Sequence, residues 1–402
     1  MKAEAHAIEQ PPASRLAESS SALPTRTSGF EPPQGCIPAP ELPQVSQPVS
    51  VGAILGVCGL AHAVIDALSA GILWTLWQRE MLSLSETQLA FVIYNLLAFG
   101  IEPVLGLLVD YSRRPRAAAL LGSAVVVGAT AIFSRWPISA VVAAGLGNAL
   151  FHLGAGSICL RLTPGQATAP GIFVAPGAVG LFAGTCLGQA GNFVAWPFVL
   201  VLAGLGLALT RTRLPMANAP QSASLREWKW PLVVGALMLA CVGVRSLVGW
   251  SIAMPWKSAF LLASVAVVAV ALGKALGGLL ADKWGWGRVA VGALALATPL
   301  LAFGANSPGA AIAGLFLFNI PMAITLAGTA NLLPGRPAFA FGLTCLALEL
   351  GMWPVTQPDV GAGVFAEPWM IFGLVFGAAT ALYAALHTAF LRLPAQFTGV
   401  HE

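Results

Sequence analysis

Charged residues are scarce in this chain. Only 9% of its 402 residues are Asp, Glu, Lys or Arg, whereas 57% are hydrophobic. An average protein carries roughly 25% charged residues. A water-soluble core cannot bury so much apolar surface, so we expect lipid to surround most of the chain. The net charge of +4 is too small to indicate a nucleic-acid partner.

Several motifs of enzymes and pumps are also missing. No segment reads GxxxxGK followed by Ser or Thr, which argues against an ATP-driven pump. HExxH, GxSxG and Cys/His clusters with metal-ligand spacing do not occur, and the six cysteines include no CxxC pair. The sequence therefore predicts no enzyme, no cofactor, no metal and no disulfide framework.

Apolar segments make up most of the remaining sequence. A bilayer core of about 30 Å requires about 20 apolar residues per helix, and twelve segments approach this length. They cover residues 52–77, 88–109, 117–134, 138–160, 171–191, 193–210, 231–253, 258–281, 289–305, 309–331, 338–357 and 368–391. We therefore expect an all-α membrane protein with twelve transmembrane helices in two pseudo-symmetric six-helix bundles.

Composition divides the chain into five parts. The first 50 residues are rich in Pro and Ser and contain no apolar run, which is typical of disorder. A polar stretch with two prolines separates the sixth and seventh apolar segments. The predicted parts are a cytoplasmic tail 1–50, an N-terminal bundle 51–210, a linker 211–230, a C-terminal bundle 231–393 and a short tail 394–402.

Lys and Arg residues gather on one side of the predicted membrane. With a cytoplasmic N-terminus, fifteen of them fall in inner loops and tails, and only Arg79, Arg135 and Lys257 fall in outer loops. Inner loops of membrane proteins carry such an excess. We expect a multi-pass inner-membrane protein with both termini in the cytoplasm.

One motif occurs twice. Gly106 and Asp110 precede the basic residues Arg113 and Arg114 at the end of the second segment, and Gly278 and Asp282 precede Lys283 and Arg288 at the end of the eighth. An internal repeat half a protein apart is typical of secondary transporters. An aspartate at a helix end can accept hydrogen bonds from the N-terminus of a facing helix and pair with a cation. The predicted conformational latch comprises Gly106, Asp110, Arg113, Arg114, Gly278, Asp282, Lys283 and Arg288.

Ionisable residues inside the bilayer are costly and are therefore candidates for function. Asp66 lies in the first segment with His62 one turn before it on the same face, and Glu102 lies in the second segment. We expect these three residues to couple transport to protons, with Asp66 as the main carboxylate. The alternative is a structural role: an ion pair that only satisfies Asp66, or polar support beside Pro103 for Glu102.

Three more polar residues are candidates for the wall of a substrate cavity: Arg245, Glu349 and His152. Arg245 could pair with Asp66 or Glu349, or it could attract an anionic substrate. For His152, packing between helices is the alternative role.

Four glycines follow one another at three- and four-residue spacing in the fifth segment: Gly177, Gly180, Gly184 and Gly188. Small residues allow transmembrane helices to approach closely. The stripe predicts a packing seam, either static or formed against the C-terminal half and moving during transport.

The repeated motif resembles the signature loops of the major facilitator superfamily. Within it, the chain resembles the fosmidomycin-resistance efflux group at Gly59-Leu-Ala-His62-Ala-Val-Ile-Asp66, at Phe151-His152, at Leu332-Leu-Pro-Gly-Arg336 and at Arg245. The resemblance implies a twelve-helix inner-membrane carrier that exports a small molecule against proton entry.

The expected function is alternating-access transport of a small organic molecule, by proton-coupled efflux. The alternatives are uptake of a metabolite, by proton symport or by facilitated diffusion, and a non-transporting membrane receptor. Expected partners are the substrate, protons and the lipid bilayer, and we expect a monomer.

The predicted topology can be tested by thiol labelling. In a background without native cysteines, Ser112→Cys and Gly287→Cys should react with an impermeant reagent only from the cytoplasmic side. Arg135→Cys should react only from the outside. Labelling of Ser112→Cys and Gly287→Cys from opposite sides would contradict the two-bundle arrangement.

Overall fold

The computed structural model describes residues 50–214, 228–356 and 362–397, and these residues contain helices but no strand. The predicted tail over 1–50 lies outside the described residues except for Ser50. Most of the predicted linker and the end of the C-terminal tail lie outside them as well.

Seven α-helices and one π-helix form the N-terminal half. They are α1 (Val51–Gln78), α2 (Leu84–Asn95), the π-helix η1 (Leu96–Gly100), α3 (Glu102–Ser112), α4 (Pro115–Ile132), α5 (Pro137–Leu162), α6 (Thr168–Gln189) and α7 (Trp196–Arg211). The C-terminal half contains α8 (Lys229–Ser251), the 3-10 helix η3 (Pro255–Ser258), α9 (Phe260–Trp284), α10 (Trp286–Gly304), α11 (Pro308–Asn319), α12 (Pro321–Leu332), α13 (Pro337–Thr356), α14 (Ala362–Ala366) and α15 (Pro368–Arg392).

The predicted all-α membrane fold is confirmed. Eleven helical segments are long and apolar enough to cross a membrane, and the twelfth, α7, is shorter. Two of the segments are interrupted: η1 divides the second between α2 and α3, and Pro321 divides the tenth between α11 and α12. At both breaks the helical hydrogen-bond pattern changes, while the backbone dihedrals of Ile101 and Ile320 stay in the right-handed helical region.

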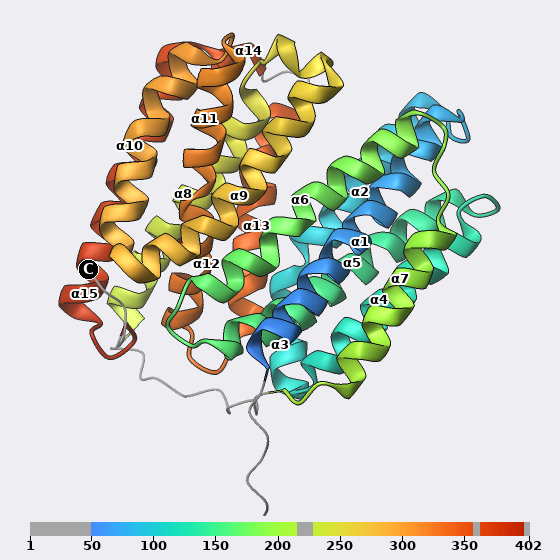
Figure 1. The fold of residues 1–402 in the computed structure, drawn as a ribbon, viewed down its shortest axis with the longest axis horizontal. Coiled ribbons are helices and arrows are strands. Elements are labelled where there is room, and N and C mark those ends of the chain that lie inside the picture. Colours follow the sequence, from blue (N-terminus) through green and yellow to red (C-terminus); the bar gives the residue numbers. More distant parts are fainter. Residues whose placement is uncertain (1–49, 215–227, 357–361, 398–402) are drawn as a thin grey trace, which may run out of the picture. The chain divides into compact units, whose positions relative to one another are not determined.

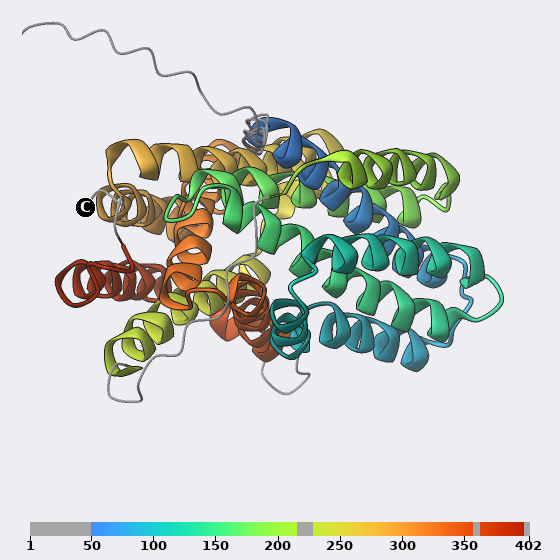
Figure 2. The same ribbon diagram turned by 90° about the horizontal axis from the view of Figure 1, so that it is seen from below.

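The helices form two groups (Figure 1), which meet in the middle of the molecule when it is seen from below (Figure 2). Each group has its own apolar core. One core is formed mainly by α1, α5 and α6 and includes Leu68 and Phe151. The other is formed mainly by α8, α10 and α15 and includes Trp286 and Leu382.

The polarity of the helix surfaces matches a lipid environment. Large apolar side chains such as Leu108, Leu261 and Phe376 are more than half exposed. Buried positions, by contrast, include Glu102, Asn148 and other polar residues. Lipid solvates the apolar side chains, so the polar groups inside the bundles must find partners within the protein.

The two halves meet along two pairs of helices, α3 with α13 and α6 with α9. Glycines make both contacts close. A Cβ atom at Gly106 would lie 2.6 Å from the Ala338 carbonyl oxygen, and one at Gly171 would lie 2.7 Å from the Lys274 carbonyl oxygen. The backbones of the two halves can therefore touch directly.

The glycine stripe of α6 lies against α1, in the same half of the protein. Added Cβ atoms along the stripe would meet His62 and Asp66 at Gly177, Ala63 at Gly180, Ala67 at Gly184 and Trp74 at Gly188. The expectation of a seam against the C-terminal half is thus corrected, because other positions of α6, such as Gly171, face that half. The stripe is a close-packed contact inside one bundle.

This contact predicts a stability effect. Gly180→Ala would push a methyl group into the backbone of Ala63 and should destabilise the protein by about 1–3 kcal/mol, as overpacking usually does. Gly128→Ala in α4 is the control, because no atom lies within 4 Å of its added Cβ. Thermal unfolding in detergent should show a lower midpoint for Gly180→Ala only, and equal midpoints would contradict the close contact.

Candidate functional site

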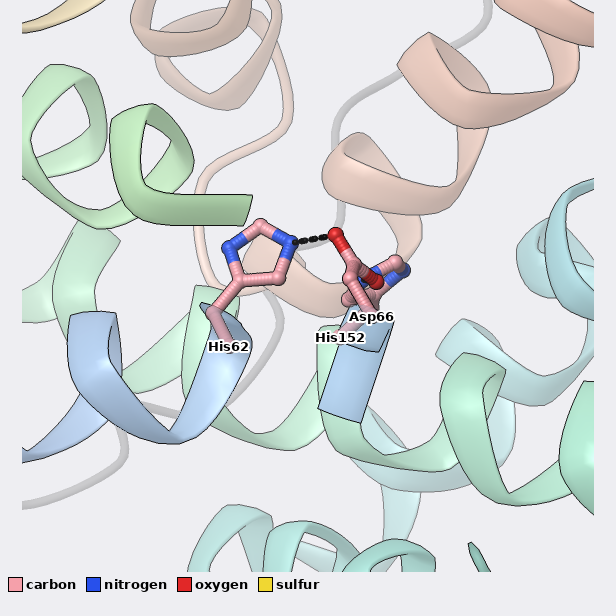
Figure 3. Close-up of side chains that lie close together, drawn as sticks. All are labelled: His62, Asp66 and His152. Atoms are coloured by element: carbon pink, nitrogen blue, oxygen red, sulfur yellow. Dashed lines mark ion pairs between the residues drawn. The ribbon is translucent and has the colours of Figure 1, made fainter. Parts of the chain in front are cut away.

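A cluster of polar side chains lies inside the N-terminal bundle. His62 and Asp66 stand one turn apart on α1, with 3.3 Å between His62 Nε2 and Asp66 Oδ2 (Figure 3). The other ring nitrogen, His62 Nδ1, lies 3.0 Å from the carbonyl oxygen of Phe173 on α6. A carbonyl only accepts hydrogen bonds, so Nδ1 carries a proton and the ring orientation is fixed. The Phe173 ring also stacks on the imidazole.

His152 of α5 joins the cluster from the opposite side of Asp66 (Figure 3). Its Nε2 lies 3.5 Å from Asp66 Oδ1, and its Nδ1 lies 3.1 Å from Glu102 Oε1. The imidazole is therefore placed between two carboxylates. The three residues predicted for proton coupling lie together, and His152, which we expected in the cavity wall, belongs to the same group.

The π-helix η1 helps to place Glu102. It ends at Gly100, and Glu102 begins α3 with Pro103 directly after it. A π-turn adds one residue to a helical turn, which rotates the following side chains by roughly 100°. The Glu102 side chain is fully buried, and its Oε2 has no hydrogen-bond partner among the described residues.

Two neighbours complete the cluster. Asn148 of α5 donates from Nδ2 to the Tyr94 hydroxyl at 2.6 Å and lies 3.4 Å from Asp66 Oδ1. The Cys345 thiol of α13 lies beside the Glu102 carboxylate. Because α13 belongs to the C-terminal half, the cluster reaches the interface between the halves. Sequence analysis missed Tyr94, Asn148 and Cys345, which carry no local signal of their role.

The other predicted cavity residues, Arg245 and the partly buried Glu349 of α13, form no hydrogen bond or ion pair with the cluster among the described residues. Arg245 of α8 is only 6% exposed. Its Nη2 faces the Met322 sulfur, and its Nη1 has no hydrogen-bond partner within the described part of the chain. Within that part it forms no ion pair with Asp66 or Glu349, so neither pairing considered from the sequence occurs in this conformation.

The first copy of the repeated motif connects the two halves. Asp110, near the end of α3, accepts hydrogen bonds from the backbone N–H groups of Ala338 at 3.2 Å and Phe339 at 2.8 Å. These groups belong to the first turn of α13, whose N–H groups lack partners in the helix. Arg161 of α5 also donates to Asp110 at 3.4 Å.

The second copy makes the reciprocal connection. Asp282, near the end of α9, accepts from the N–H groups of Ala167 at 2.9 Å and Thr168 at 2.8 Å, where α6 begins. The Thr168 hydroxyl at 2.6 Å and Trp286 Nε1 at 3.0 Å donate to the same carboxylate. Each half thus supplies one aspartate that caps a helix of the other half.

The predicted latch residues divide into two groups. Gly106 and Gly278, one turn before the aspartates, face the capped helices, where a side chain would clash. The basic residues Arg113, Arg114, Lys283 and Arg288 are exposed and form no ion pair with a described residue. The cation beside Asp110 is Arg161, which the sequence showed only as an inner-loop charge.

Comparison with known proteins supports a fold and no closer relationship. No protein-family model and no curated protein matches the chain. Among solved structures, the outward conformation of the major facilitator transporter FucP is 15% identical, with a TM-score of 0.58, covering 85% of this chain and 98% of its own. The human organic anion transporter TETRAN is 14% identical, with a TM-score of 0.60 and coverages of 85% and 100%.

A bacterial homologue of the iron transporter ferroportin, in an outward-facing state, is 15% identical, with a TM-score of 0.53 and coverages of 85% and 98%. At such identities the likeness concerns the fold alone. The two bundles, the reciprocal helix contacts and these neighbours together establish that the chain has the fold of the major facilitator superfamily.

Proposed function

We propose that this protein is a secondary active transporter that works by alternating access. The observation that carries the proposal is the reciprocal capping by Asp110 and Asp282. Each carboxylate holds a helix N-terminus of the other half, so both contacts must break if the halves separate at this end. A pair of such contacts, related by the internal repeat, suits two bundles that rock about a central site.

The membrane orientation follows from the Lys and Arg residues at this end. Arg113, Arg114, Lys283 and Arg288 lie beside the two aspartates in the chain, and an excess of cations favours the cytoplasmic side. On this assignment the described conformation is closed toward the cytoplasm. We propose that a second conformation, open toward the cytoplasm, forms when both caps are released.

The buried cluster is our candidate for proton coupling. Four contacts join ring nitrogens to oxygens: His62 with Phe173 and Asp66, and His152 with Asp66 and Glu102. Each contact is favourable only with one proton between the two atoms. Four protons shared by two imidazoles and two carboxylates give a net charge of zero. Loss of one proton leaves two lone pairs facing each other and a buried negative charge, which is costly in the bilayer.

Glu102 belongs both to the cluster that holds the protons and to the interface between the two halves. It lies where α3 touches α13, because a Cβ at Gly342 would meet the Glu102 carbonyl carbon at 2.6 Å. Rocking of the halves changes the surroundings of Glu102 and thereby the stability of its proton. Proton coupling is compatible with this fold, since one neighbour is a fucose:proton symporter.

The transported substrate is proposed to be a small molecule that leaves the cell as protons enter. The outward direction rests on the resemblance of the His62–Asp66 segment to efflux proteins. Protons and substrate would use the same passage at different stages of the cycle, as alternating access requires.

Proton coupling predicts a pH-dependent conformational equilibrium that needs Asp66. With spin labels at Arg113→Cys and Trp284→Cys, on different halves at the proposed cytoplasmic end, the distance distribution should differ between acidic and alkaline buffer. Asp66→Asn should largely remove this difference, because the amide cannot share the protons of His62 and His152. Glu86→Gln, which changes an exposed residue at the start of α2, is the control. An unchanged pH response in Asp66→Asn would exclude Asp66 from coupling.

Loss of one of the two aspartate caps should shift the conformational equilibrium toward the state that is open at the cytoplasmic end. Asp282→Asn keeps the size of the side chain but loses the charge and part of the acceptor capacity, which is worth about 0.5–2 kcal/mol at a helix N-terminus. The longer inter-label distance should therefore gain population by about two- to thirtyfold, since each 1.4 kcal/mol corresponds to a factor of ten.

The control for this shift is Glu367→Gln, because Glu367 precedes α15 without a side-chain cap bond. The same double-label measurement reports both variants. A distance distribution of Asp282→Asn that equals the parent's would show that this cap does not hold the conformation.

A further inference from the structure

We propose that His62, Asp66 and His152 form a binding site for a divalent transition-metal cation. This inference rests on the proposed transport function, because it names the class of ion that the central site would carry. The ligand atoms are Nε2 of His62, Nε2 of His152 and the Asp66 carboxylate, which all lie within 4.8 Å of one another. This site could not be predicted from the sequence, since its ligands come from α1 and α5 and have no metal-binding spacing.

The distances suit a metal better than they suit direct hydrogen bonds. Charge-assisted hydrogen bonds between nitrogen and oxygen measure about 2.7–2.9 Å. The contacts of Asp66 with the two imidazoles are longer, at 3.3 Å and 3.5 Å. A tetrahedral ion with bonds of about 2.0–2.2 Å separates its ligand atoms by about 3.4 Å. The two contacts are close to this length, and they reach different oxygens of Asp66, Oδ2 from His62 and Oδ1 from His152, so both carboxylate oxygens face the site.

The far side of each imidazole is arranged as in known metal centres. A metal-ligating histidine nearly always donates its other N–H to a backbone carbonyl or a carboxylate. His62 Nδ1 lies 3.0 Å from the Phe173 carbonyl oxygen, and His152 Nδ1 lies 3.1 Å from Glu102 Oε1. Both rings are thus held with Nε2 directed toward Asp66. Asn148 Nδ2, 3.4 Å from Asp66 Oδ1, orients the carboxylate.

Two further observations bear on the site: the weak contact of His152 Nε2 and the close approach of Gly177 to the ligands. His152 Nε2 is buried and makes no well-formed hydrogen bond among the described residues, because Asp66 Oδ1 lies 3.5 Å from it. A Cβ at Gly177 would lie 2.6 Å from His62 Nε2 and 2.8 Å from Asp66 Oδ2. A side chain at Gly177 would therefore displace two of the three ligands.

The charges around the site permit a cation. Tyr94 of α2, Glu102 of α3 and Cys345 of α13 face the cluster, and none of these groups is cationic. Lys274 of α9 lies within electrostatic range of Asp66, but no Lys or Arg nitrogen among the described residues lies within 4 Å of the carboxylate. Two imidazoles and one carboxylate favour Zn²⁺, Fe²⁺ or Co²⁺ over Ca²⁺ and Mg²⁺, which prefer oxygen ligands.

Binding of a divalent cation displaces two protons from the cluster, so that the total charge is unchanged. A metal must replace the two protons between the Nε2 atoms and Asp66, because ligating nitrogens are deprotonated. The protons on the two Nδ1 atoms remain. One M²⁺ thus enters as two H⁺ leave, and the net charge of the four side chains plus ion stays zero. The cluster would then exchange one divalent cation for two protons without moving charge.

Zn²⁺ binding to the purified full-length protein tests the proposal. Titration calorimetry should give one site, with about two protons released per ion when buffers of different ionisation enthalpy are compared. His152→Gln should remove this site. Glu102→Gln should weaken it by about 10–100-fold, as loss of the partner of a ligating histidine does. Co²⁺ as a probe should add visible absorption bands of an ion bound to nitrogen.

Gly177→Ala supplies a variant that keeps every ligand. Its methyl group would displace the ends of His62 and Asp66, so Zn²⁺ affinity should fall by at least about tenfold, the size of effect that disturbed ligand orientation has elsewhere. Gly56→Ala on α1 is the matched control, because its added Cβ meets no atom within 4 Å. Its affinity should equal that of the parent.

Two results would overturn the metal site. The first is that the folded parent protein binds no stoichiometric Zn²⁺. The second is that the parent and His152→Gln bind Zn²⁺ with equal affinity. Neither result would affect the proposed transport function, which is measured separately through the distances between spin labels. Conversely, Zn²⁺ binding without a conformational response to Asp282→Asn would support the site and contradict the role of the caps.

Discussion

The hydrogen bonds between each aspartate and a helix of the opposite half are the interaction on which the arrangement depends. A helix N-terminus that reaches the membrane boundary has N–H groups without partners, and lipid offers none. Asp110 supplies acceptors for α13, and Asp282 supplies them for α6. Because the acceptor and the helix lie in different halves, the bonds hold the halves together at one end only. The glycine one turn earlier is required so that the backbones can approach within reach of the carboxylate.

One helix connects this contact to the buried cluster. Glu102 and Asp110 both belong to α3, about 12 Å apart at the rise of an α-helix, and both face α13. A rigid helix transmits a tilt along its whole length, so α3 cannot move away from α13 at Asp110 without changing the surroundings of Glu102. In the proposed mechanism, the cluster and the interface that opens therefore share the helix α3. No longer pathway of contacts is needed between them.

The features that depend on residues close together in the chain could be predicted from the sequence. Hydropathy predicted the helices, four-residue spacing placed His62 beside Asp66, and the repeat identified both aspartates. Contacts between distant helices could not be derived in this way. His152 lies between Asp66 and Glu102 only because α5 crosses α1 and α3 at that depth, and Arg161 reaches Asp110 for the same reason. The π-helix before Glu102 has no sequence signature, and the direction of the glycine stripe depends on which neighbour α6 meets.

The two halves differ in the charged groups that they place in the interior. This difference affects the release of a cation as well as its binding. The N-terminal half contributes the imidazoles and carboxylates of the cluster. The C-terminal half contributes Arg245, which forms no ion pair with a described residue, and Lys274, which lies within electrostatic range of Asp66. Charges act over longer distances in a low-dielectric interior than in water. Positive charge near Asp66 lowers the affinity of the cluster for any cation, whether protons or a metal. If the protein carries a cation, as proposed, this positive charge favours its release.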